Sequence, residues 1–565
     1  MQKGHVVNDV FNLSPAQKKW VDSTLSKLSL ERKAAQTLNV ISGWFETDLG
    51  KKTLDEIAQY QPGSTVAGGT TWRKIRQTEE QIQAVSEIPV VVNADFEMGA
   101  YITDGTQFTH AMGMAAIADA KLAEQMVYAA GQAAAKQGRA VGVHWALAPV
   151  CDLNRNFRNP ITNIRSFGDD LGRVKRLSAA YIRGLQENGF AATAKHFPGD
   201  GYSDLDQHKI TTVNPLNHHD WFRQSGAVFQ NAIDAGVLTI MPGHIACPAL
   251  DPSRNQRGRP IPATFSQVLL QDVLRGRMGF TGLIVSDAFD MGGCLEHEKT
   301  IHDAAVRGLI AGLDVVLFIR DIPRTIQAIC QAVEDGRLSE QRLNDAARRV
   351  LSLKARLGLR TGYKLPSQAQ ARKVFEPKLL QKQATRSAEL SITLQCDRQK
   401  VLPLDGAKVK KVLVNIENDE QFWGQDQVKL FGNRLPSMQF VEEFKKRGIK
   451  VDVVEDPGEG QTRKVYENYD AIIYMFNNGP QASRCSIQPC RQALRDVDWI
   501  VINGEKPVIF VALRSPYLKY YLPGAPCVVL TYSSAETVQT ALVRALLGEI
   551  PFKGKPPVEI PENEG

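Results

Sequence analysis

Short, continuous apolar runs recur along the first part of the chain, and longer stretches with helical periodicity separate them. Runs of this kind, bounded by turn residues, are typical of strands that a parallel sheet buries on both faces. Amphipathic helices are predicted between them, for example over 118–138, 220–236 and 300–312. The apolar runs that we interpret as strands lie at residues 36–42, 64–69, 89–95, 141–153, 191–196, 237–244, 282–289 and 314–320.

Strands that alternate with helices in this way predict an α/β fold that begins with a (β/α)8 TIM-type barrel. A helix predicted over 14–27 precedes the first strand, and another over 343–358 follows the last. The residues after it are polar and broken by Gly and Pro, as expected of a linker. We therefore predict a catalytic barrel domain over 1–359 and a linker over 360–377.

The rest of the chain, 378–565, is predicted to form a smaller C-terminal α/β sandwich domain. It opens with a helix predicted over 378–391. Two further helices are predicted in FVEEFKKRGI and TVQTALVRALLG. A G-x-G at Gly458–Gly460 lacks the strand-to-helix context of a nucleotide-binding fingerprint, so we interpret it as a loop. The candidate strands are 410–417, 450–455, 470–477, 507–513 and 527–532.

Composition and charge narrow the class of partner. The formal net charge is +7 over 565 residues, and Lys and Arg are dispersed, so we expect no nucleic-acid partner. No 18-residue apolar segment suggests a membrane span, and we expect no membrane association. The start of the chain lacks the apolar run of a signal peptide. We therefore predict a cytoplasmic protein, with a secreted mature form as the alternative.

The eight cysteines form no disulfide framework. Only Cys485 and Cys490 lie close together, and no second pair or histidine set completes a zinc site. Reduced, structural thiols are expected, and no cofactor or metal is predicted. The other cysteines are Cys151, Cys247, Cys294, Cys330, Cys396 and Cys527.

Polar and ionisable residues stand at the ends of the predicted barrel strands. Because the active site of such a barrel lies at the C-terminal ends of its strands, these residues should converge on one mouth. A single polar strand end would carry little weight, but five of them indicate a site. The strand-end residues are Asn93 with Asp95, Asp152, Lys195 with His196, His244, and Ser286 with Asp287.

The stretch Ala194–His208, AKHFPGDGYSDLDQH, concentrates this chemistry in one loop. A carboxylate next to an imidazole orients it and stabilises its charged form, so Asp206 and His208 fit a general acid/base. Asp287 fits either a helix cap or a carboxylate nucleophile. Lys195 and His196 fit donors to substrate oxygens. For Lys195 the alternative is a buried ion pair with Asp95 or Asp287.

This loop resembles the signature of the family 3 glycoside hydrolases, in their β-N-acetylglucosaminidase branch. The branch has Lys-His-Phe-Pro-Gly-x-Gly, four residues, and then Asp-x-His, and this chain matches with 202–205 as the spacer. Collinear segments are also similar: NADFEMGA, APVCDLNRNFRNPITNIRSFGDD, GLIVSDAFDMGG and the terminal LGEIPFKGKPPVEIP. The resemblance implies that Asp287 is the nucleophile, that His208 oriented by Asp206 is the acid/base, and that Asp95 and Arg165 contact the sugar. We expect Lys195, His196 and His244 to bind substrate as well.

The resemblance also implies an activity. It predicts a retaining exo-hydrolase that releases terminal non-reducing β-linked N-acetylglucosamine from chitin oligosaccharides or cell-wall fragments, as a monomer or homodimer. A covalent glycosyl-enzyme intermediate would form, with the two reacting groups about 5–5.5 Å apart in such enzymes. The His208 loop would then close over the sugar if it is open without substrate. Phosphate could compete with water as the acceptor, because the general base is neutral.

Two positions depart from the usual pattern. Asp200 replaces the more usual His after Pro-Gly, and Asp95–Gly99 reads Asp-Phe-Glu-Met-Gly where many relatives have Asp-Gln-Glu-Gly-Gly. Three alternatives stay open: a β-glucosidase of the same family, a non-catalytic carbohydrate-binding scaffold, and a metal-dependent barrel hydrolase. The last would use His196, His208, His244 and Asp287 as zinc ligands.

Overall fold

The computed structural model describes residues 9–41, 51–68, 70–376, 378–418, 437–456, 461–480, 486–489 and 506–561. It divides into two compact units, each assembled from separate stretches of the chain. The barrel unit comprises 1–105, 131–152 and 178–377, and the sandwich unit comprises 106–130, 153–177 and 378–565. The stretches 106–130 and 153–177 therefore belong to the sandwich unit although barrel strands flank them in sequence.

The barrel unit is built on an eight-stranded parallel sheet with the strand order β4-β3-β2-β1-β10-β9-β7-β5. Bridges between Trp145 and Ala191 and between Val150 and Lys195 link the two end strands, so the sheet is nearly closed. The predicted barrel is confirmed, and every predicted strand run contains or overlaps one strand. The strands are β1 (Leu38–Ile41), β2 (Ser64–Val66), β3 (Val91–Ala94), β4 (Trp145–Ala146), β5 (Thr193–Phe197), β7 (Thr239–Pro242), β9 (Leu283–Ala288) and β10 (Val315–Ile319).

Strand β4 is much shorter than the apolar run at 141–153 predicts. Beyond it, the chain still runs beside β5, because Thr193 N donates to Ala148 O and Cys151 N donates to Lys195 O. Pro149 has no N–H to donate, which removes one rung of a regular ladder. The run is therefore extended, but only two of its residues meet the criteria of a strand.

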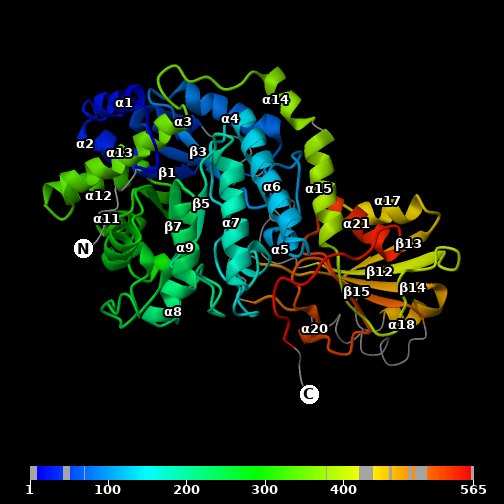
Figure 1. Cartoon of the computed structure of the whole chain (residues 1–565). Coiled ribbons are helices and arrows are strands. Elements are labelled where there is room, and N and C mark those ends of the chain that lie inside the picture. The colour runs from blue at the N-terminus through cyan, green and yellow to red at the C-terminus, as the bar shows by residue number, and fades with distance from the viewer. Residues whose placement is uncertain are drawn as a thin grey trace. The chain divides into compact units, whose positions relative to one another are not determined.

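Helices surround this sheet (Figure 1). The apolar faces of α1 and α13 contribute Val21, Leu25, Val350 and Leu351 to a core that includes Trp145. The region predicted as one helix over 220–236 is two, α8 and α9. The helices and short elements are α1 (Pro15–Leu25), α2 (Leu30–Gln36), α3 (Lys51–Tyr60), α4 (Trp72–Ala84), α8 (His218–Arg223), α9 (Ser225–Asp234), η2 (Ala263–Phe265), the π-helix η3 (Val268–Arg277), α10 (Gly292–Leu295), α11 (Ile301–Ala311), α12 (Ile322–Glu334), α13 (Glu340–Arg356) and α14 (Gln368–Phe375), with strands β6 (Thr212–Val213) and β8 (Ile245–Ala246).

The sandwich unit holds a six-stranded sheet with the order β11-β16-β15-β14-β12-β13. All five predicted strands are present and parallel, and the unpredicted β11 pairs antiparallel with β16 at one edge. Because only one of its five residues is buried, β11 gives no continuous apolar run. The strands are β11 (Thr393–Asp397), β12 (Lys411–Asn418), β13 (Lys450–Glu455), β14 (Ala471–Asn477), β15 (Val508–Ala512) and β16 (Cys527–Leu530).

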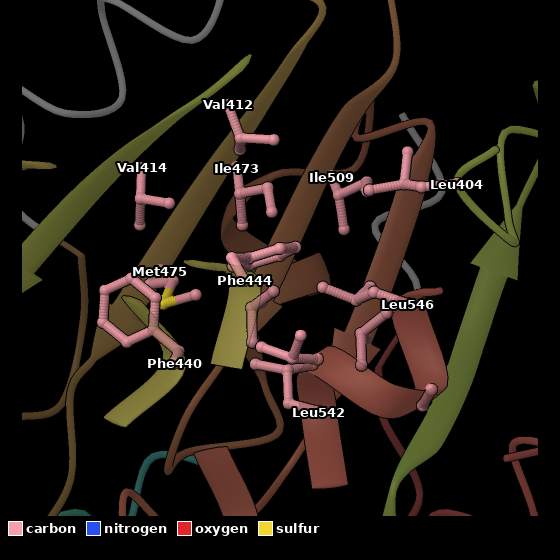
Figure 2. Close-up of a cluster of buried hydrophobic side chains, with 14 of the residues drawn as sticks. Leu404, Val412, Val414, Phe440, Phe444, Ile473, Met475, Ile509, Leu542 and Leu546 are labelled. Carbon is pink, nitrogen blue, oxygen red and sulfur yellow. The ribbon is translucent and has the colours of Figure 1, made fainter. Parts of the chain in front are cut away.

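Each face of this sheet buries its own apolar core. On one face, Phe440 and Phe444 of α17 and Leu542 of α21 pack over Val414 and Ile473 (Figure 2). The other face buries a second cluster that includes Ile164, from the stretch 153–177. The helices are α5 (Ala111–Ala115), η1 (Asn163–Arg165), α15 (Lys378–Ser391), α17 (Gln439–Lys445), α18 (Gln461–Val465), η4 (Tyr466–Asn468), α20 (Leu518–Tyr521) and α21 (Glu536–Leu546), while α6 (Ala120–Val141) and α7 (Leu171–Gln186) contain residues of both units.

The structure also bears on the predictions for membrane spans and cysteines. Within the described stretches, no helix is both long and apolar enough to cross a membrane. The six cysteines found there are free thiols. Cys485, Cys490 and the loop at Gly458–Gly460 lie outside the described residues.

Candidate functional site

Strand β5 delivers two functional side chains, Lys195 and His196, and all five of its residues are buried. The strand ends at Pro198-Gly199, where Gly199 N donates back to His196 O over 2.7 Å. Gly199 has φ +115°, a conformation that only glycine adopts readily. A Cβ there would also lie 2.7 Å from Ser225 Oγ. The tight turn that follows the Lys-His pair therefore requires the glycine of the motif.

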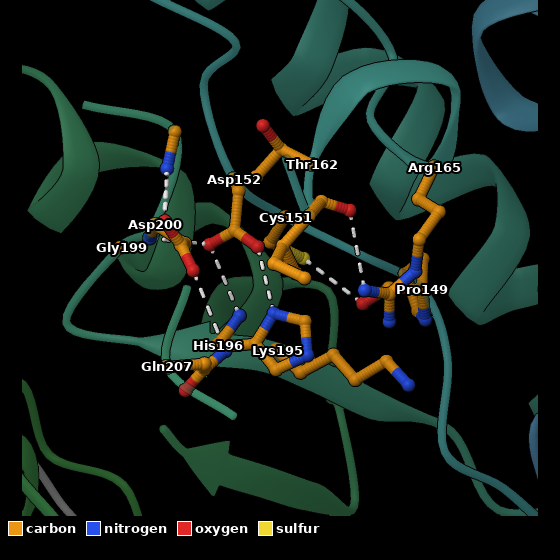
Figure 3. A network of polar contacts seen from close by, with 12 residues as sticks. Pro149, Cys151, Asp152, Thr162, Arg165, Lys195, His196, Gly199, Asp200 and Gln207 are labelled. Carbon is orange, nitrogen blue, oxygen red and sulfur yellow. Dashed lines mark hydrogen bonds and ion pairs between the residues drawn. The ribbon is translucent and has the colours of Figure 1, made fainter. Parts of the chain in front are cut away.

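His196 is held by Asp152, which follows the short strand β4. His196 Nδ1 lies 2.8 Å from Asp152 Oδ2, and His196 N donates to Asp152 Oδ1 over 3.1 Å (Figure 3). Asp200 N donates to the same Oδ1 over 2.8 Å. The two side chains are 4% and 0% exposed, respectively. Asp152 therefore fixes both the ring of His196 and the backbone of the loop that begins there.

Lys195 forms a buried ion pair on each of two sides. Its Nζ lies 2.9 Å from Asp95 Oδ1 and 2.9 Å from Glu97 Oε1, and its side chain is 3% exposed. The Asp95 side chain is 37% exposed, whereas that of Glu97 is 16% exposed. Of the two partners expected in the ion-pair interpretation, Asp95 and Asp287, the structure shows Asp95, and Glu97 is a further partner that was not expected. Asp95 can contact a ligand while Lys195 holds its other side.

His208 is held in the same way as His196, but nearer the solvent. Its Nδ1 lies 2.7 Å from Asp206 Oδ1, and its backbone N donates to that oxygen over 2.8 Å. The Asp206 side chain is 0% exposed and the His208 side chain is 25% exposed. Because a carboxylate oxygen accepts, Nδ1 carries a proton, and Nε2 is the nitrogen available for proton exchange.

The His208 loop is fastened to the turn that follows Asp287. Gly292 N donates to His208 O over 2.8 Å, and Gly293 N donates to Gln207 O over 3.2 Å. A Cβ on Gly292 would lie 2.3 Å from Lys209 O, and one on Gly293 would lie 2.7 Å from Gln207 O. The two glycines of DMGG therefore permit a backbone contact that no larger residue allows. In this conformation the loop is tied down at His208 and is not an unattached flap.

Asp287 lies near the end of β9 and is partly buried, and its Oδ1 accepts from Ala288 N over 2.8 Å. Burial favours the neutral acid. The nearby His196, His244 and His208 imidazoles, together with the Ala288 N–H, outweigh burial and lower the pKa of Asp287 below its ordinary value. Asp287 is therefore kept ionised, and these three histidines are near enough to act on its charge.

His244 is fully buried, and both of its ring nitrogens have protein partners. Nε2 lies 2.9 Å from Ala288 O, and Nδ1 lies 3.0 Å from Thr264 Oγ1. Its backbone N donates to Gln207 Oε1 over 3.0 Å. Burial lowers the pKa of His244, and its Nε2 faces the carbonyl next to Asp287. This geometry supports the strand end that carries Asp287.

Arg165 belongs to the sandwich unit, where it ends the 3-10 helix η1. Its Nη1 donates to Ile161 O over 3.3 Å, and the side chain is partly buried. The loop that carries it is held by residues after β15, since Asn154 Nδ2 donates to Tyr517 OH over 3.1 Å. Asn163 Nδ2 donates to Ser515 Oγ over 3.2 Å.

Glu97 and Gln207 were not among the predicted site residues, and Asp152 was predicted to lie at the barrel mouth without a role of its own. Asp152 was noted as a strand end, but its partner His196 is 44 positions away. Glu97 lies in the quoted Asp-Phe-Glu-Met-Gly segment, and the signal was its spacing of two residues from Asp95. Gln207 is 1% exposed; its Oε1 accepts from His244 N and its Nε2 donates to Asp200 Oδ2. Nothing in its sequence position distinguishes it from an exposed loop residue.

The metal-hydrolase alternative requires several ligands around one point. Among the described residues, which include all four proposed ligands, no group of three or more His, Cys, Asp or Glu side chains is arranged to hold a metal ion. The Nδ1 atoms of His196 and His208 are instead committed to carboxylates. The barrel mouth thus offers an ionised carboxylate, a partly exposed imidazole and a set of buried hydrogen-bonding groups, which suits acid/base and nucleophilic chemistry.

Known proteins resemble this chain over most or all of its length. Residues 29–353 match the glycosyl hydrolase family 3 N-terminal domain. A β-N-acetylglucosaminidase/β-glucosidase from Cellulomonas fimi is 32% identical over 566 residues, which cover 96% of this chain and 95% of that protein.

Solved structures agree with this match. A β-glucoside phosphorylase, BglX, bound to 2FGlc superimposes with a TM-score of 0.87 at 28% identity, covering 99% of both chains. A family 3 β-N-acetylglucosaminidase from Paenibacillus sp. has the same fold, with a TM-score of 0.79 at 24% identity over 94% of this chain and 99% of that one. The chain therefore belongs to glycosyl hydrolase family 3 and is a glycoside hydrolase.

Proposed function

We propose that this enzyme is a retaining exo-β-N-acetylglucosaminidase that forms a covalent glycosyl-enzyme intermediate on Asp287, with His208 as acid/base and Asp206 as the carboxylate that orients it. One observation carries the proposal: a partly exposed imidazole, held at Nδ1 by a fully buried carboxylate, lies on a loop whose backbone is hydrogen-bonded to the turn that follows Asp287. Terminal N-acetylglucosamine of chitin oligosaccharides or cell-wall fragments would be the released sugar.

In the first step, the Asp287 carboxylate attacks the anomeric carbon while the bond to the leaving oxygen breaks. The imidazolium of His208 donates its Nε2 proton to that oxygen, and Asp206 stabilises the charged ring beforehand. In the second step, the neutral Nε2 takes a proton from water, which attacks the anomeric carbon and releases Asp287. The depressed pKa of Asp287 supports the first step, because the nucleophile must be ionised.

Sugar binding is assigned to Asp95 and Arg165, as the resemblance implies, and to Lys195 and His196, which fit donors to substrate oxygens. Asp95 is the most exposed member of the Lys195 ion-pair cluster, so its carboxylate can accept bonds from sugar hydroxyls. His196 is fixed at Nδ1 by Asp152, which leaves Nε2 as its ligand-facing nitrogen. Both ring nitrogens of His244 have protein partners. We therefore assign His244 to support of the strand end that carries Asp287.

The Cellulomonas fimi relative is a β-N-acetylglucosaminidase/β-glucosidase, which supports the N-acetylglucosaminide assignment and keeps glucosides as the alternative substrate. The structural relative BglX is a β-glucoside phosphorylase, which favours a second candidate for the second step. There a phosphate oxygen attacks the anomeric carbon, the bond to Asp287 breaks, and a sugar 1-phosphate leaves. A neutral imidazole base repels phosphate less than a carboxylate base does.

The test compares hydrolysis of 4-nitrophenyl N-acetyl-β-D-glucosaminide with that of the corresponding glucoside, each with and without inorganic phosphate. We expect the N-acetyl substrate to be preferred. Preference for the glucoside would replace the substrate assignment, and absence of turnover with both would contradict the enzymatic proposal. Sugar 1-phosphate in the phosphate arm would identify phosphorolysis, while free sugar alone in both arms would exclude it.

A further inference from the structure

A hydrogen-bonded chain outside the proposed reacting groups joins the end of the His208 loop to the turn after Asp287. Thr211 lies three residues beyond His208, and its hydroxyl donates to Gly293 O over 2.9 Å. The same hydroxyl oxygen lies 2.9 Å from His297 Nε2, and His297 Nδ1 lies 3.1 Å from Asn255 Nδ2. The His297 side chain is 0% exposed.

The direction of each hydrogen bond between Asn255, His297 and Thr211 follows from the orientation of the Asn255 amide group. Asn255 Oδ1 accepts from Arg257 N over 2.9 Å and from Arg259 N over 3.0 Å, so the amide group faces His297 with its Nδ2 donor. His297 Nδ1 must then accept, which places the ring proton on Nε2. Nε2–H donates to Thr211 Oγ1, whose own proton goes to Gly293 O. Each donor meets an acceptor only while His297 is neutral.

The burial of His297 agrees with this tautomer. Burial lowers the pKa of His297 to about 4, more than the neighbouring Glu296 raises it, and Arg307 lowers it further. Glu296 Oε1 also accepts from Thr211 N over 2.7 Å, so both polar groups of Thr211 that can donate are engaged by 293–296. The ring is therefore neutral at ordinary pH, and it links Thr211 to Asn255 through its two nitrogens.

We infer that Thr211, His297 and Asn255 are positioning residues that hold the acid/base His208 in register with the nucleophile Asp287. The inference rests on the proposed function, because it uses the roles assigned there. The contacts run from one reacting loop to the other: Gly292 N bonds to His208 O, and Thr211 bonds to Gly293 O and Glu296. Loss of this anchor lets His208 drift from the leaving oxygen, and misplacement of a reacting group by about 1 Å can cost about 10²-fold in rate.

The chain offers a matched control one residue away. Thr212 is 1% exposed, and its hydroxyl has no hydrogen-bond partner among the described residues. Thr211→Val removes a hydroxyl that both accepts and donates, whereas Thr212→Val removes one that does neither. Both residues are β-branched and buried, so the two substitutions change volume and polarity alike. Thr211→Ser keeps the hydroxyl and serves as the conservative rescue.

The experiment measures kcat/KM of these variants on phenyl and 2,4-dinitrophenyl N-acetyl-β-D-glucosaminides. The first leaving group needs protonation and the second does not. We expect Thr211→Val to lose about three- to tenfold on the phenyl substrate, the size of one or two lost hydrogen bonds, and less than about twofold on the dinitrophenyl substrate. Thr212→Val and Thr211→Ser should both stay within about twofold of wild type on each.

A double substitution separates positioning from general damage. In a His208→Ala background, Thr211→Val should cause no further loss, because its effect passes through His208. Equal losses on both substrates, a loss that persists in the His208→Ala background, or an equal loss in Thr212→Val would overturn the inference.

Backbone amide hydrogen exchange of peptides covering 206–213 tests the anchor without any substrate. Faster exchange in Thr211→Val than in Thr212→Val supports the anchor, and identical exchange overturns it. A wild-type enzyme that cleaves neither glycoside would contradict the proposed function instead, while the exchange comparison would still decide whether the anchor exists.

Discussion

Two His–Asp pairs stand at the mouth of the barrel, and they are built alike. In each, the aspartate binds the ring Nδ1 and the backbone N of the same histidine, at 2.8 and 3.1 Å for His196 with Asp152 and at 2.7 and 2.8 Å for His208 with Asp206. Both aspartate side chains are 0% exposed. The difference lies in the imidazoles, because the His196 side chain is 4% exposed and that of His208 is 25% exposed.

That difference separates two uses of one arrangement. A buried imidazole with a fixed ring is a rigid hydrogen-bonding group, whereas an accessible one can also exchange protons with water and with a leaving group. Asp152 in addition accepts from Asp200 N, so it organises the loop as well as the ring. We therefore propose proton transfer for His208 and sugar binding by a fixed ring for His196, and substitutions at each pair test that division.

The largest effect is expected from Asp287→Asn, since the proposed reaction begins at this carboxylate. Removal of the nucleophile should lower kcat/KM by more than about 10⁴-fold even with 4-nitrophenyl N-acetyl-β-D-glucosaminide. The measurement is steady-state turnover, with thermal unfolding as the folding control. Retention of a tenth of wild-type activity by the folded variant would remove Asp287 from this role.

The next effect is expected from His208→Ala, which removes the exposed ring. On a substrate with a poor leaving group, such as the phenyl glycoside, kcat/KM should fall by about 10²- to 10⁴-fold, the usual contribution of a general acid. Asp206→Asn should give a smaller loss in the same direction, because the ring remains but its orientation and charge are less well supported. A phenyl-glycoside rate within about twofold of wild type in His208→Ala would show that the acid lies elsewhere.

A smaller and different effect is expected from Asp152→Asn. The substitution replaces one carboxylate oxygen by an NH2 group, which cannot accept a hydrogen bond. Asp152 accepts hydrogen bonds from His196 and Asp200, and the site is fully buried. The free energy of unfolding should fall by about 1–3 kcal/mol, and KM should rise because His196 loses its fixed orientation. Chemical denaturation and KM together provide the check. Wild-type stability with a large fall in kcat would reverse the assignments of the two pairs.

The pH profile gives the smallest but most specific prediction. The folded pKa of Asp287 is depressed, so its ionised form persists, and the stability this contributes is lost only as pH falls through that folded pKa. The acid limb of kcat/KM should therefore lie below the ordinary aspartate range. An acid limb between about pH 5 and 6 would be inconsistent with an ionised Asp287.

The two pairs also show which contacts of the site can be predicted from the sequence and which cannot. Asp206 and His208 are two residues apart, so their pairing was predicted from the loop alone, and the barrel was predicted from eight apolar runs. Asp152 and His196 are separated by 44 positions and meet only because the segment after β4 runs beside β5. The Thr211–His297–Asn255 chain has the same property. Contacts of this kind depend on which strand ends and loops become neighbours, and local pattern does not encode that.

Glycines behave differently in this respect. Gly199 could be predicted as a turn from Pro-Gly, but the need for Gly292 and Gly293 arises from the carbonyls of Lys209 and Gln207 in another loop. The sequence displayed the Gly-Gly pair without indicating what it approaches. Likewise, the five-residue edge strand β11 gave no signal, because its side chains are mostly half-exposed.

The most direct test of the division between the two pairs is the leaving-group dependence of kcat/KM. Aryl N-acetyl-β-D-glucosaminides spanning a range of phenol acidity would be compared for wild type, His208→Ala and His196→Ala. We predict that kcat/KM falls much more steeply with decreasing phenol acidity in His208→Ala, and that His196→Ala runs parallel to wild type at a lower level. A steeper dependence in His196→Ala, or an unchanged one in His208→Ala, would contradict the account.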